Sequence, residues 1–127
     1  IYDTNSIDRL KLRSFAVCNK MEIHDHYPLG IISLTKEELE RYNFQKGDTE
    51  GLVNVILSVE GVKIGVILIE KGGCVKMSFR SKEQYYVNEF ANKYFNGGGH
   101  KYAAGGMSEL SVNDTLIKLK SLISELF

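Results

Sequence analysis

The sequence is poor in cysteine and proline, lacks tryptophan and has no long apolar run. Cys18 and Cys74 are the only cysteines, and because no signal-peptide pattern precedes them we interpret both as free thiols in a reducing compartment. The longest strongly apolar run, VILI at 66–69, is far too short to cross a bilayer. These absences argue against a disulfide-stapled secreted scaffold and against a membrane partner, and they predict a cytoplasmic location.

The charge of the chain is balanced, because 16 basic residues face 16 acidic ones. A protein that coats nucleic acid carries a net basic field, so any phosphate site in this chain must be local. The chain begins at Ile1 rather than Met. We therefore expect a piece of a longer protein, in which residues 1–24 form a linker helix from a missing upstream domain and residues 25–127 form one domain.

Hydrophobic periodicity predicts helices and strands that alternate along the chain. Strands are expected at 27–35, 62–70 and 74–81 and near 106–110, and helices after Thr35, over 49–58 and 87–95, and from 112. A further stripe at helical spacing predicts a helix over 6–21, capped by Ser6 or Asn5; its members are Ile7, Leu10, Ser14, Val17 and Met21. The pattern indicates an α/β fold with a single mixed β-sheet of about four to five strands flanked by helices, preceded by the linker helix.

Residues 96–106, NGGGHKYAAGG, hold five of the twelve glycines of the chain. Consecutive glycines let the backbone bend tightly and present N–H groups with no Cβ in the way, an arrangement that suits a phosphate or carboxylate. A short helix beginning near Ala103 and Ala104 would add a partial positive charge. The competing interpretation is that the glycines serve only sharp turns.

Three cationic side chains are candidates for the same anion site. His100 and Lys101 follow the glycines directly. Strict alternation along CVKMSFRS places Arg80 on the polar side of its strand, near the strand's carboxyl end, where open sheets bind ligands. An arginine offers a planar two-donor fork to phosphate. The loop is not a Walker motif, because Tyr102 rather than Ser or Thr follows Lys101.

Other polar residues are weaker candidates for chemistry. His24 and His26 with Asp25 are too few ligands to specify a metal site, so we interpret them as an exposed linker. Asp48 and Glu50 could act as acid–base groups, but capping of the following helix explains them as well. We predict no catalytic and no metal-binding residue within the chain.

The motifs FNGGGHKYAAGG and SFRS together resemble the signature of the DHH-associated C-terminal domain of DHH-family phosphoesterases. YDTNS at 2–6 and GDTEGLVN at 47–54 resemble the branch of oligoribonucleases (nanoRNases) that also act as phosphatases on 3′-phosphoadenosine 5′-phosphate. The glycine–histidine loop of the family corresponds to Gly97, Gly98, Gly99 and His100. Its Ser-x-Arg-Ser segment ends at Arg80 and Ser81, and Asn96 replaces the usual fourth glycine.

The resemblance implies a substrate-binding domain in which Arg80, Ser81, the glycine loop and His100 hold the phosphate of a short RNA or nucleotide. We expect Lys101 to contribute to the same site from its place next to His100. In the family, two manganese ions and an activated water belong to an upstream Asp-His-His domain, which these residues lack. We therefore expect the chain alone to be inactive and the full protein to be a manganese-dependent hydrolase. A homodimer is the oligomer we consider for the full protein. The alternatives are a free-standing RNA- or nucleotide-binding module, or part of a cyclic-dinucleotide or single-strand DNA phosphodiesterase of the same superfamily.

Overall fold

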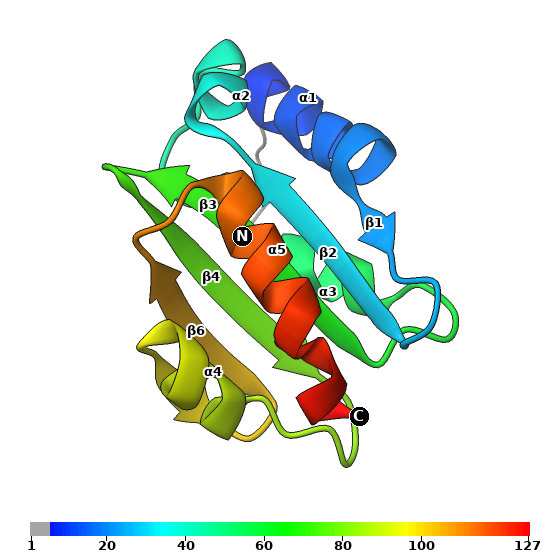
Figure 1. Ribbon diagram of the computed structural model, residues 1–127. Coiled ribbons are helices and arrows are strands. Elements are labelled where there is room, and N and C mark those ends of the chain that lie inside the picture. Colours follow the sequence, from blue (N-terminus) through cyan, green and yellow to red (C-terminus); the bar gives the residue numbers. More distant parts are fainter. Residues whose placement is uncertain (1–5) are drawn as a thin grey trace.

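Six strands form one mixed sheet in the order β1-β2-β3-β4-β6-β5, in a computed structural model that describes residues 6–127 (Figure 1). The strands are β1 (Glu22–Ile23), β2 (Leu29–Leu34), β3 (Ile64–Lys71), β4 (Cys74–Ser81), β5 (Gly98–His100) and β6 (Ala103–Ser108). The helices are α1 (Ile7–Phe15), α2 (Lys36–Arg41), α3 (Leu52–Leu57), α4 (Asn88–Phe95) and α5 (Val112–Leu122), with a π-helical turn η1 (Ala16–Lys20) after α1 and a 3-10 turn η2 (Ile123–Leu126) after α5.

The predicted mixed α/β sheet is confirmed. β2 and β3 pair in parallel, with α2 and α3 between them in the chain, and the other neighbours pair antiparallel. The sheet has six strands rather than four or five because two short edge strands add to it. β1 has two residues and β5 has three, two of them glycine, so neither carries the alternating apolar pattern by which strands are recognised.

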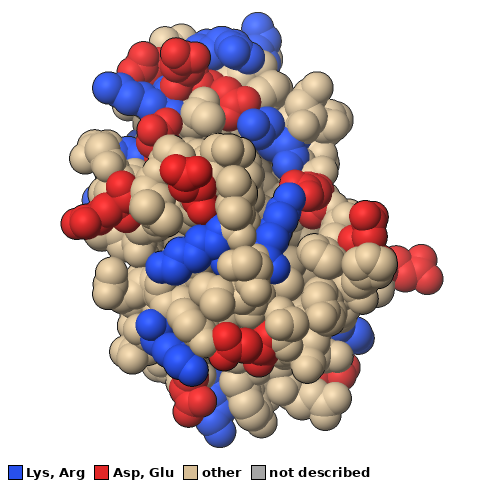
Figure 2. All heavy atoms as spheres, viewed as in Figure 1, with Lys and Arg blue, Asp and Glu red and all other residues tan. Residues whose placement is uncertain are grey.

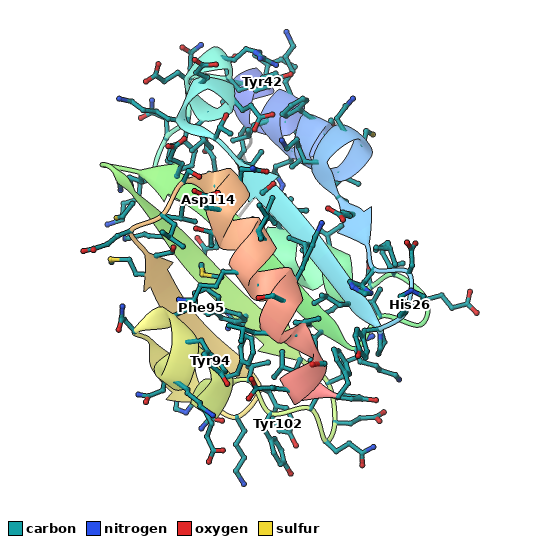
Figure 3. The ribbon with its side chains drawn as sticks, in the orientation of Figure 1. His26, Tyr42, Tyr94, Phe95, Tyr102 and Asp114 are labelled. Atoms are coloured by element: carbon teal, nitrogen blue, oxygen red, sulfur yellow. The ribbon has the colours of Figure 1, made fainter. Side chains whose placement is uncertain are left out.

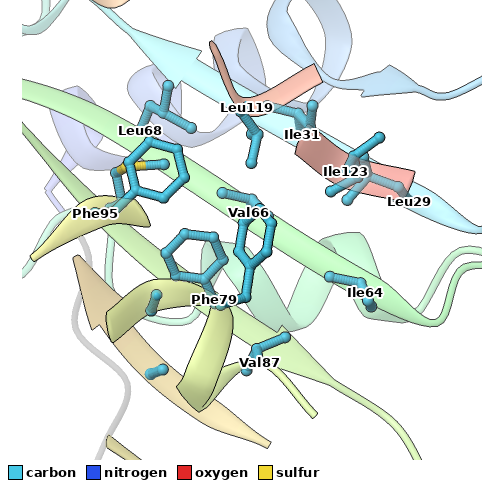
Figure 4. Packing of buried hydrophobic residues seen from close by; sticks show 14 of the residues in the cluster. Leu29, Ile31, Ile64, Val66, Leu68, Phe79, Val87, Phe95, Leu119 and Ile123 are labelled. Carbon is cyan, nitrogen blue, oxygen red and sulfur yellow. The ribbon is translucent and has the colours of Figure 1, made fainter. Parts of the chain in front are cut away.

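The main core lies between one face of the sheet and the helices α4 and α5, which cover that face (Figures 1 and 4). Val75, Met77 and Phe79 alternate along β4 toward this face, as the sequence predicts. Phe79 and Phe95 are fully buried, with ring centroids 6.0 Å apart. Because α4 supplies Phe95 at its last turn, burial of this ring fixes where the glycine segment leaves the helix.

The second core lies on the opposite face, beneath α1 and α3. Leu12 and Ala16 are fully buried there, whereas Ile7 and Leu10 of the predicted apolar stripe are 63% and 47% exposed. This part of the stripe therefore faces away from the sheet, whereas Met21 at its end packs against the second core. Gly65 of β3 lets α3 lie close, since a Cβ at this position would lie 3.2 Å from the Val53 carbonyl oxygen.

Three predicted helix starts are confirmed by side-chain caps. Ser6, Thr35 and Ser111 each accept a hydrogen bond from the amide three residues ahead. Of the two predicted caps of α1, Asn5 lies outside the described residues, as does most of the 2–6 motif. None of the helices in residues 6–127 has the length and apolar content that spanning a membrane requires.

The helix predicted over 49–58 is wrong at its start, because α3 begins at Leu52. Gly51 precedes it with φ +85°, a left-handed conformation that interrupts the helix. The Asp48 carboxylate instead accepts from the amide of Gln45 at 2.9 Å and closes a turn. Arg13 anchors this turn to α1 by donating to the Glu50 carbonyl oxygen at 2.7 Å. Asp48 and Glu50 therefore do not cap α3.

Candidate functional site

Arg80 and His100 lie in one row across three strands. Arg80 of β4 is opposite Ala103 of β6, and Ala103 is opposite His100 of β5. Directly paired residues project from the same face of a sheet, so the Arg80 and His100 side chains share a face with the Ala103 methyl group between them. Neighbouring strands are spaced by about 4.8 Å, which puts the two backbones about 10 Å apart.

The next row of this face is made of very small residues. Ser78 of β4 is opposite Gly105 of β6, which is opposite Gly98 of β5. A third row holds Lys76 and Met107, and Lys76 is exposed while Met107 is 42% exposed. The surface is thus a floor of hydroxyl and backbone atoms, with Arg80 and His100 on one side and Lys76 on the other. We call this surface the bare face.

The bare face lies on the same side of the sheet as α3. Gly65 is opposite Arg80, and α3 packs directly on Gly65, so Arg80 stands at the border of the covered area. Lys82 marks the same border by donating from Nζ to the carbonyl oxygen of Leu57, the last residue of α3, at 2.6 Å. Beyond this border Ser78, Ala103 and Gly105 remain partly exposed. A ligand can therefore approach Arg80 and His100 from solvent.

Backbone hydrogen bonds fix the turn that follows His100. Lys101 and Tyr102 connect β5 to β6, and both of their carbonyl oxygens accept backbone hydrogen bonds. The donors are the Val87 amide at 2.8 Å and the Ser81 amide at 3.0 Å, respectively. The side chains of the turn are therefore presented on a fixed backbone. The Lys101 ammonium lies 5.2 Å from the centre of the Tyr86 ring, a cation–π contact rather than a free charge beside His100.

The glycines allow the backbone to pack closely, and they do not form the predicted run of free amides for an anion. A Cβ at Gly97 would lie 1.8 Å from the Gly105 carbonyl oxygen, and Gly99 has φ +146°. The Gly97 amide already donates to the Ala91 carbonyl oxygen at 3.1 Å, and Gly98–His100 pair with β6. The expectation of a run of unpaired amides is therefore wrong. Ala103 and Ala104 begin a strand, so the predicted helix dipole at this point is wrong as well.

Ser81 lies apart from the other candidates. It is opposite Ile64 and follows Phe79 by two residues, so its side chain belongs to the face covered by α4 and α5, opposite to Arg80. It is only 8% exposed, and its hydroxyl has no hydrogen-bond partner among residues 6–127. Ser81 thus cannot contact a ligand that lies between Arg80 and His100 on the bare face.

The reverse side of the glycine segment is less suited to an anion. A hollow of about 250 Å³ there is lined by Gly98 and Gly99 together with Asn88, Glu89 and Asn92 of α4. The Glu89 carboxylate repels phosphate, and Asn92 is already engaged, since its amide group donates to the Gly97 carbonyl oxygen at 3.1 Å. The charge distribution therefore favours the bare face over this hollow.

Figure 2 shows the side of the molecule that carries α4 and α5. Basic and acidic side chains are intermixed over it, without a broad patch of one sign, as the balanced composition leads one to expect. Such a surface offers no continuous track for a long nucleic acid strand. A phosphate site on this side of the molecule would therefore have to be local.

Two exposed tyrosines lie at the same end of the sheet. Tyr86 and Tyr102 are 49% and 42% exposed, and their ring centroids are 5.5 Å apart. Figure 3 shows Tyr102 at the rim of the molecule, whereas Phe95 points into the core. Partial burial together with the neighbouring Tyr86 and Glu83 raises the pKa of the Tyr102 hydroxyl. Tyr85, by contrast, packs at 5.3 Å against Phe127 at the edge of the core.

The described residues do not fit a manganese site. Nowhere in residues 6–127 do three His, Cys, Asp or Glu side chains gather in a way that could hold a metal ion. His24 has a structural part instead, because its Nδ1 accepts hydrogen bonds from the amides of His26 and Tyr27 at 3.0 and 3.2 Å. What the site does offer is the guanidinium of Arg80, the imidazole of His100 and the hydroxyl of Ser78, groups that can donate hydrogen bonds to an anion.

The sequence contained a signal for the floor of the site that the prediction left unused. Alternation along β4 already places Lys76 and Ser78 on the side of Arg80. The contribution of Gly105 and Ala103 could not be read in the same way, because their strand was expected to begin only at Gly106. The pairing of β6 with β4 is what brings these small residues beside Arg80.

Comparison with known proteins gives a consistent result. Residues 31–126 match the DHHA1 domain. The chain is 31% identical over 105 residues to the bifunctional oligoribonuclease and PAP phosphatase NrnA of Bacillus subtilis. The aligned region covers 83% of this chain and 32% of that protein.

Two solved structures share the fold. An exopolyphosphatase-related protein from Bacteroides fragilis superposes with a TM-score of 0.92 and 35% identity, over 98% of this chain and 36% of that one. The pGpG-specific phosphodiesterase PggH from Vibrio cholerae has a TM-score of 0.66 at 16% identity, over 93% of this chain and 39% of that one, a likeness of fold alone. The chain thus spans about a third of the length of these relatives.

Proposed function

The chain belongs to the DHHA1 domain family, and from this membership we propose that it is the substrate-binding part of a phosphoesterase. The proposed substrates are short oligoribonucleotides or 3′-phosphoadenosine 5′-phosphate, the two classes that the name of the Bacillus subtilis relative describes. The observation that carries the proposal is the row in which Arg80 and His100 flank Ala103 on an uncovered face.

In this proposal Arg80 binds a phosphate of the substrate by its guanidinium fork, and His100 donates a second hydrogen bond from the other side of Ala103. Charge-assisted hydrogen bonds of this kind are about twice as strong as neutral ones. The small residues Ser78, Gly105 and Gly98 leave room for the sugar–phosphate backbone over the floor. Lys76 supplies a further positive charge at the opposite rim.

The described residues offer no ligand set for a metal, so no step of the proposal is routed through manganese in this chain. A manganese-dependent hydrolytic centre would belong to a part of the protein outside these 127 residues. Bound at such a centre, the metal would supply the charge stabilisation and the activated water for phosphoester hydrolysis. The task of Arg80 and His100 is to position the phosphate.

Equilibrium titration of the chain with 3′-phosphoadenosine 5′-phosphate and with the 5′-phosphorylated dinucleotide pApA tests the binding function. Arg80→Ala should weaken binding of both ligands by about tenfold or more, since it removes a charged hydrogen-bonding group. Lys71→Ala is the matched control. It removes one exposed positive charge at the last residue of β3, whereas Arg80 is opposite Gly65 near the start of that strand. Equal effects of the two variants, or no effect of Arg80→Ala, would refute the proposed site.

An assay with manganese and pApA tests the division of labour. The chain alone should give no turnover, and a longer protein that includes the catalytic part should hydrolyse the dinucleotide. In that longer protein Arg80→Ala should raise KM or lower kcat/KM while the bound metal content stays unchanged. Metal-dependent turnover by the chain alone, or loss of metal in the variant, would contradict the proposal.

A further inference from the structure

The face of α1 that points away from the sheet is apolar and uncovered. Ile7, Leu10 and Val17 are 63%, 47% and 37% exposed there. Single exposed apolar side chains need no explanation, but a contiguous apolar surface marks a contact with another body. Beside these side chains lies an open hollow of about 530 Å³, whose lining includes Ile7, Leu10, Lys11, Phe15, Cys18 and Tyr42. We call the three exposed side chains and this hollow the α1 surface.

The α1 surface is on the same side of the sheet as the bare face. One row of paired residues across the sheet consists, in order, of Ile32, Ile67, Ser78 and Gly105. Ile32 and Ile67 are buried in the second core, beneath α1 and α3, whereas the other two belong to the bare face. A body that rests on the outer surface of α1 (Figure 1) therefore stands on the side where the proposed phosphate site opens.

The α1 surface is too small to hold two free copies of the chain together. α1 has 9 residues and is about 14 Å long and about 10 Å wide, so its outer face offers on the order of 150 Å². A stable interface between separate proteins buries about 800 Å² on each partner. A partner that is tethered through the same chain has a high effective concentration and needs far less contact area. The available area therefore favours a part of the same chain over a second copy.

The relatives indicate what such a tethered partner is. The Bacteroides fragilis protein matches 98% of this chain, so the match extends to α1, yet the matched part is only 36% of that protein. A chain of that length holds α1 together with a body large enough to cover it. The DHHA1 match begins at residue 31 and leaves α1 outside, although Leu12 and Ala16 anchor the helix in the second core. α1 thus belongs by packing to the domain and is free on its outer side for another part of the chain.

We propose that the α1 surface is the docking site for the remaining part of a longer chain, the part to which the proposed function assigns the hydrolytic centre. The docked part stands on the side of the bare face, and the contact orients its hydrolytic centre toward the bound phosphate. A fixed relation between reacting groups supplies a large share of catalysis. The inference rests on the proposed function for the identity of the docked part, but its contacts are separate from Arg80 and His100.

Thiol labelling tests the docking, because Cys18 is exposed and lines the hollow. In a Cys74→Ser background, Cys18 should react with an aromatic disulfide reagent at least about tenfold more slowly in a longer protein, freed of its other cysteines, than in the chain alone, since the docked part blocks access to the thiol. The matched probe is Ile117→Cys in a background without Cys18 and Cys74. Ile117 of α5 is 60% exposed on the other side of the sheet, so this thiol should react equally in both proteins.

Two results of the labelling would overturn the docking. One is an equal rate for Cys18 in the chain and in the longer protein. The other is a Cys18 rate that falls as the concentration of the chain alone rises, because this dependence would assign the α1 surface to a second copy.

Leu10→Glu separates docking from phosphate binding. In the longer protein it should restore rapid labelling of Cys18 and lower kcat/KM for pApA about tenfold, because the hydrolytic centre is no longer oriented toward the phosphate. Ile117→Glu makes the same kind of change at another exposed apolar side chain and should alter neither quantity. In the chain alone, Leu10→Glu should bind pApA like the unsubstituted chain. Continued protection of Cys18 in Leu10→Glu, or an unchanged kcat/KM, would overturn the inference.

The docking and the proposed function can fail separately. If Cys18 is unprotected in the longer protein while Arg80→Ala weakens pApA binding, the docking is overturned and the phosphate site stands. If Cys18 is protected while Arg80→Ala leaves pApA binding unchanged, the phosphate site fails and the docking stands.

Discussion

Arg80 and His100 come from opposite ends of a 21-residue stretch yet face the same solvent, one on each side of Ala103. The helix α4 lies between them in the chain and packs on the other face of the sheet. The chain therefore leaves β4, crosses the far face and returns as β5 and β6, which places the His100 imidazole near the Arg80 guanidinium. What separates the two side chains is a single methyl group, and this gap is the feature on which the proposed phosphate binding depends.

Enlarging that methyl group should block the gap. In Ala103→Val the added bulk lies between Arg80 and His100, and we expect affinity for 3′-phosphoadenosine 5′-phosphate to fall about tenfold, as when a charged hydrogen bond is lost. The thermal midpoint should hardly change, because valine suits an open strand position. Met107→Leu, on the same face two rows away, serves as the control and should bind normally. Unchanged affinity in Ala103→Val would place the ligand elsewhere.

The glycines of the loop should differ sharply in their tolerance of a side chain. Gly97→Ala puts a Cβ 1.8 Å from the Gly105 carbonyl oxygen, so we expect a loss of about 3 kcal/mol or failure to fold. Gly98→Ala meets nothing closer than Asn92 Nδ2 at 4.0 Å and should change the free energy of unfolding by less than about 1 kcal/mol. Chemical denaturation of both variants measures this difference. Similar stabilities would contradict the close packing of the backbone at Gly97 against Gly105 of β6.

The hairpin turn between β3 and β4 should accept asparagine at its first position. Gly72 and Gly73 connect the paired residues Lys71 and Cys74 with φ of +60° and +83°, the two-residue turn in which Asn-Gly is favoured. Gly72→Asn should therefore raise the free energy of unfolding by about 0.5 kcal/mol, because it restricts the unfolded chain. Gly72→Val should lower it, since a β-branched residue is strained at positive φ. A stabilising valine would show that the turn is built differently.

The carboxylate of Glu38 should make stability depend on pH in the acid range. Its burial opposes ionisation, but the Thr35 amide at 2.9 Å and the Lys20 ammonium, also at 2.9 Å, outweigh burial and hold the pKa of Glu38 below its ordinary 4.5. A lowered pKa contributes stability that is complete above about pH 4.5 and is lost as the pH falls through the folded-state value. Urea denaturation from pH 7 to pH 2.5 measures this dependence.

Glu38→Gln is the matching variant for that titration. It keeps an acceptor for the Thr35 amide but cannot ionise, so its stability should vary less with pH below 4.5 than that of the unsubstituted chain. Identical pH profiles would show that the ionised form of Glu38 contributes nothing.

Sequence periodicity was sufficient for the long elements and their caps. β4 shows strict alternation, and α5 begins where Ser111 and Asp114 predict it. The short edge strand β5 could not be predicted, because Gly98 and Gly99 have no side chains and their strand conformation depends on pairing with β6. The exposure of Ile7 and Leu10 could not be predicted either, because an apolar stripe does not show which part of the protein, if any, packs against it. The same holds for the candidate site. Arg80 and His100 were selected by their residue types, whereas their separation by the Ala103 methyl group follows only from the pairing register of β4, β6 and β5.

Amide chemical-shift mapping of the chain titrated with pApA tests the central claim most directly. The account predicts that the largest shifts fall on the bare face and its hairpin, at Ser78, Arg80, His100, Ala103 and Gly105, and that Arg80→Ala removes them. Shifts centred instead on the hollow of about 360 Å³ beside Lys36 and Phe44, at the other end of the sheet, or the absence of any shift, would contradict it.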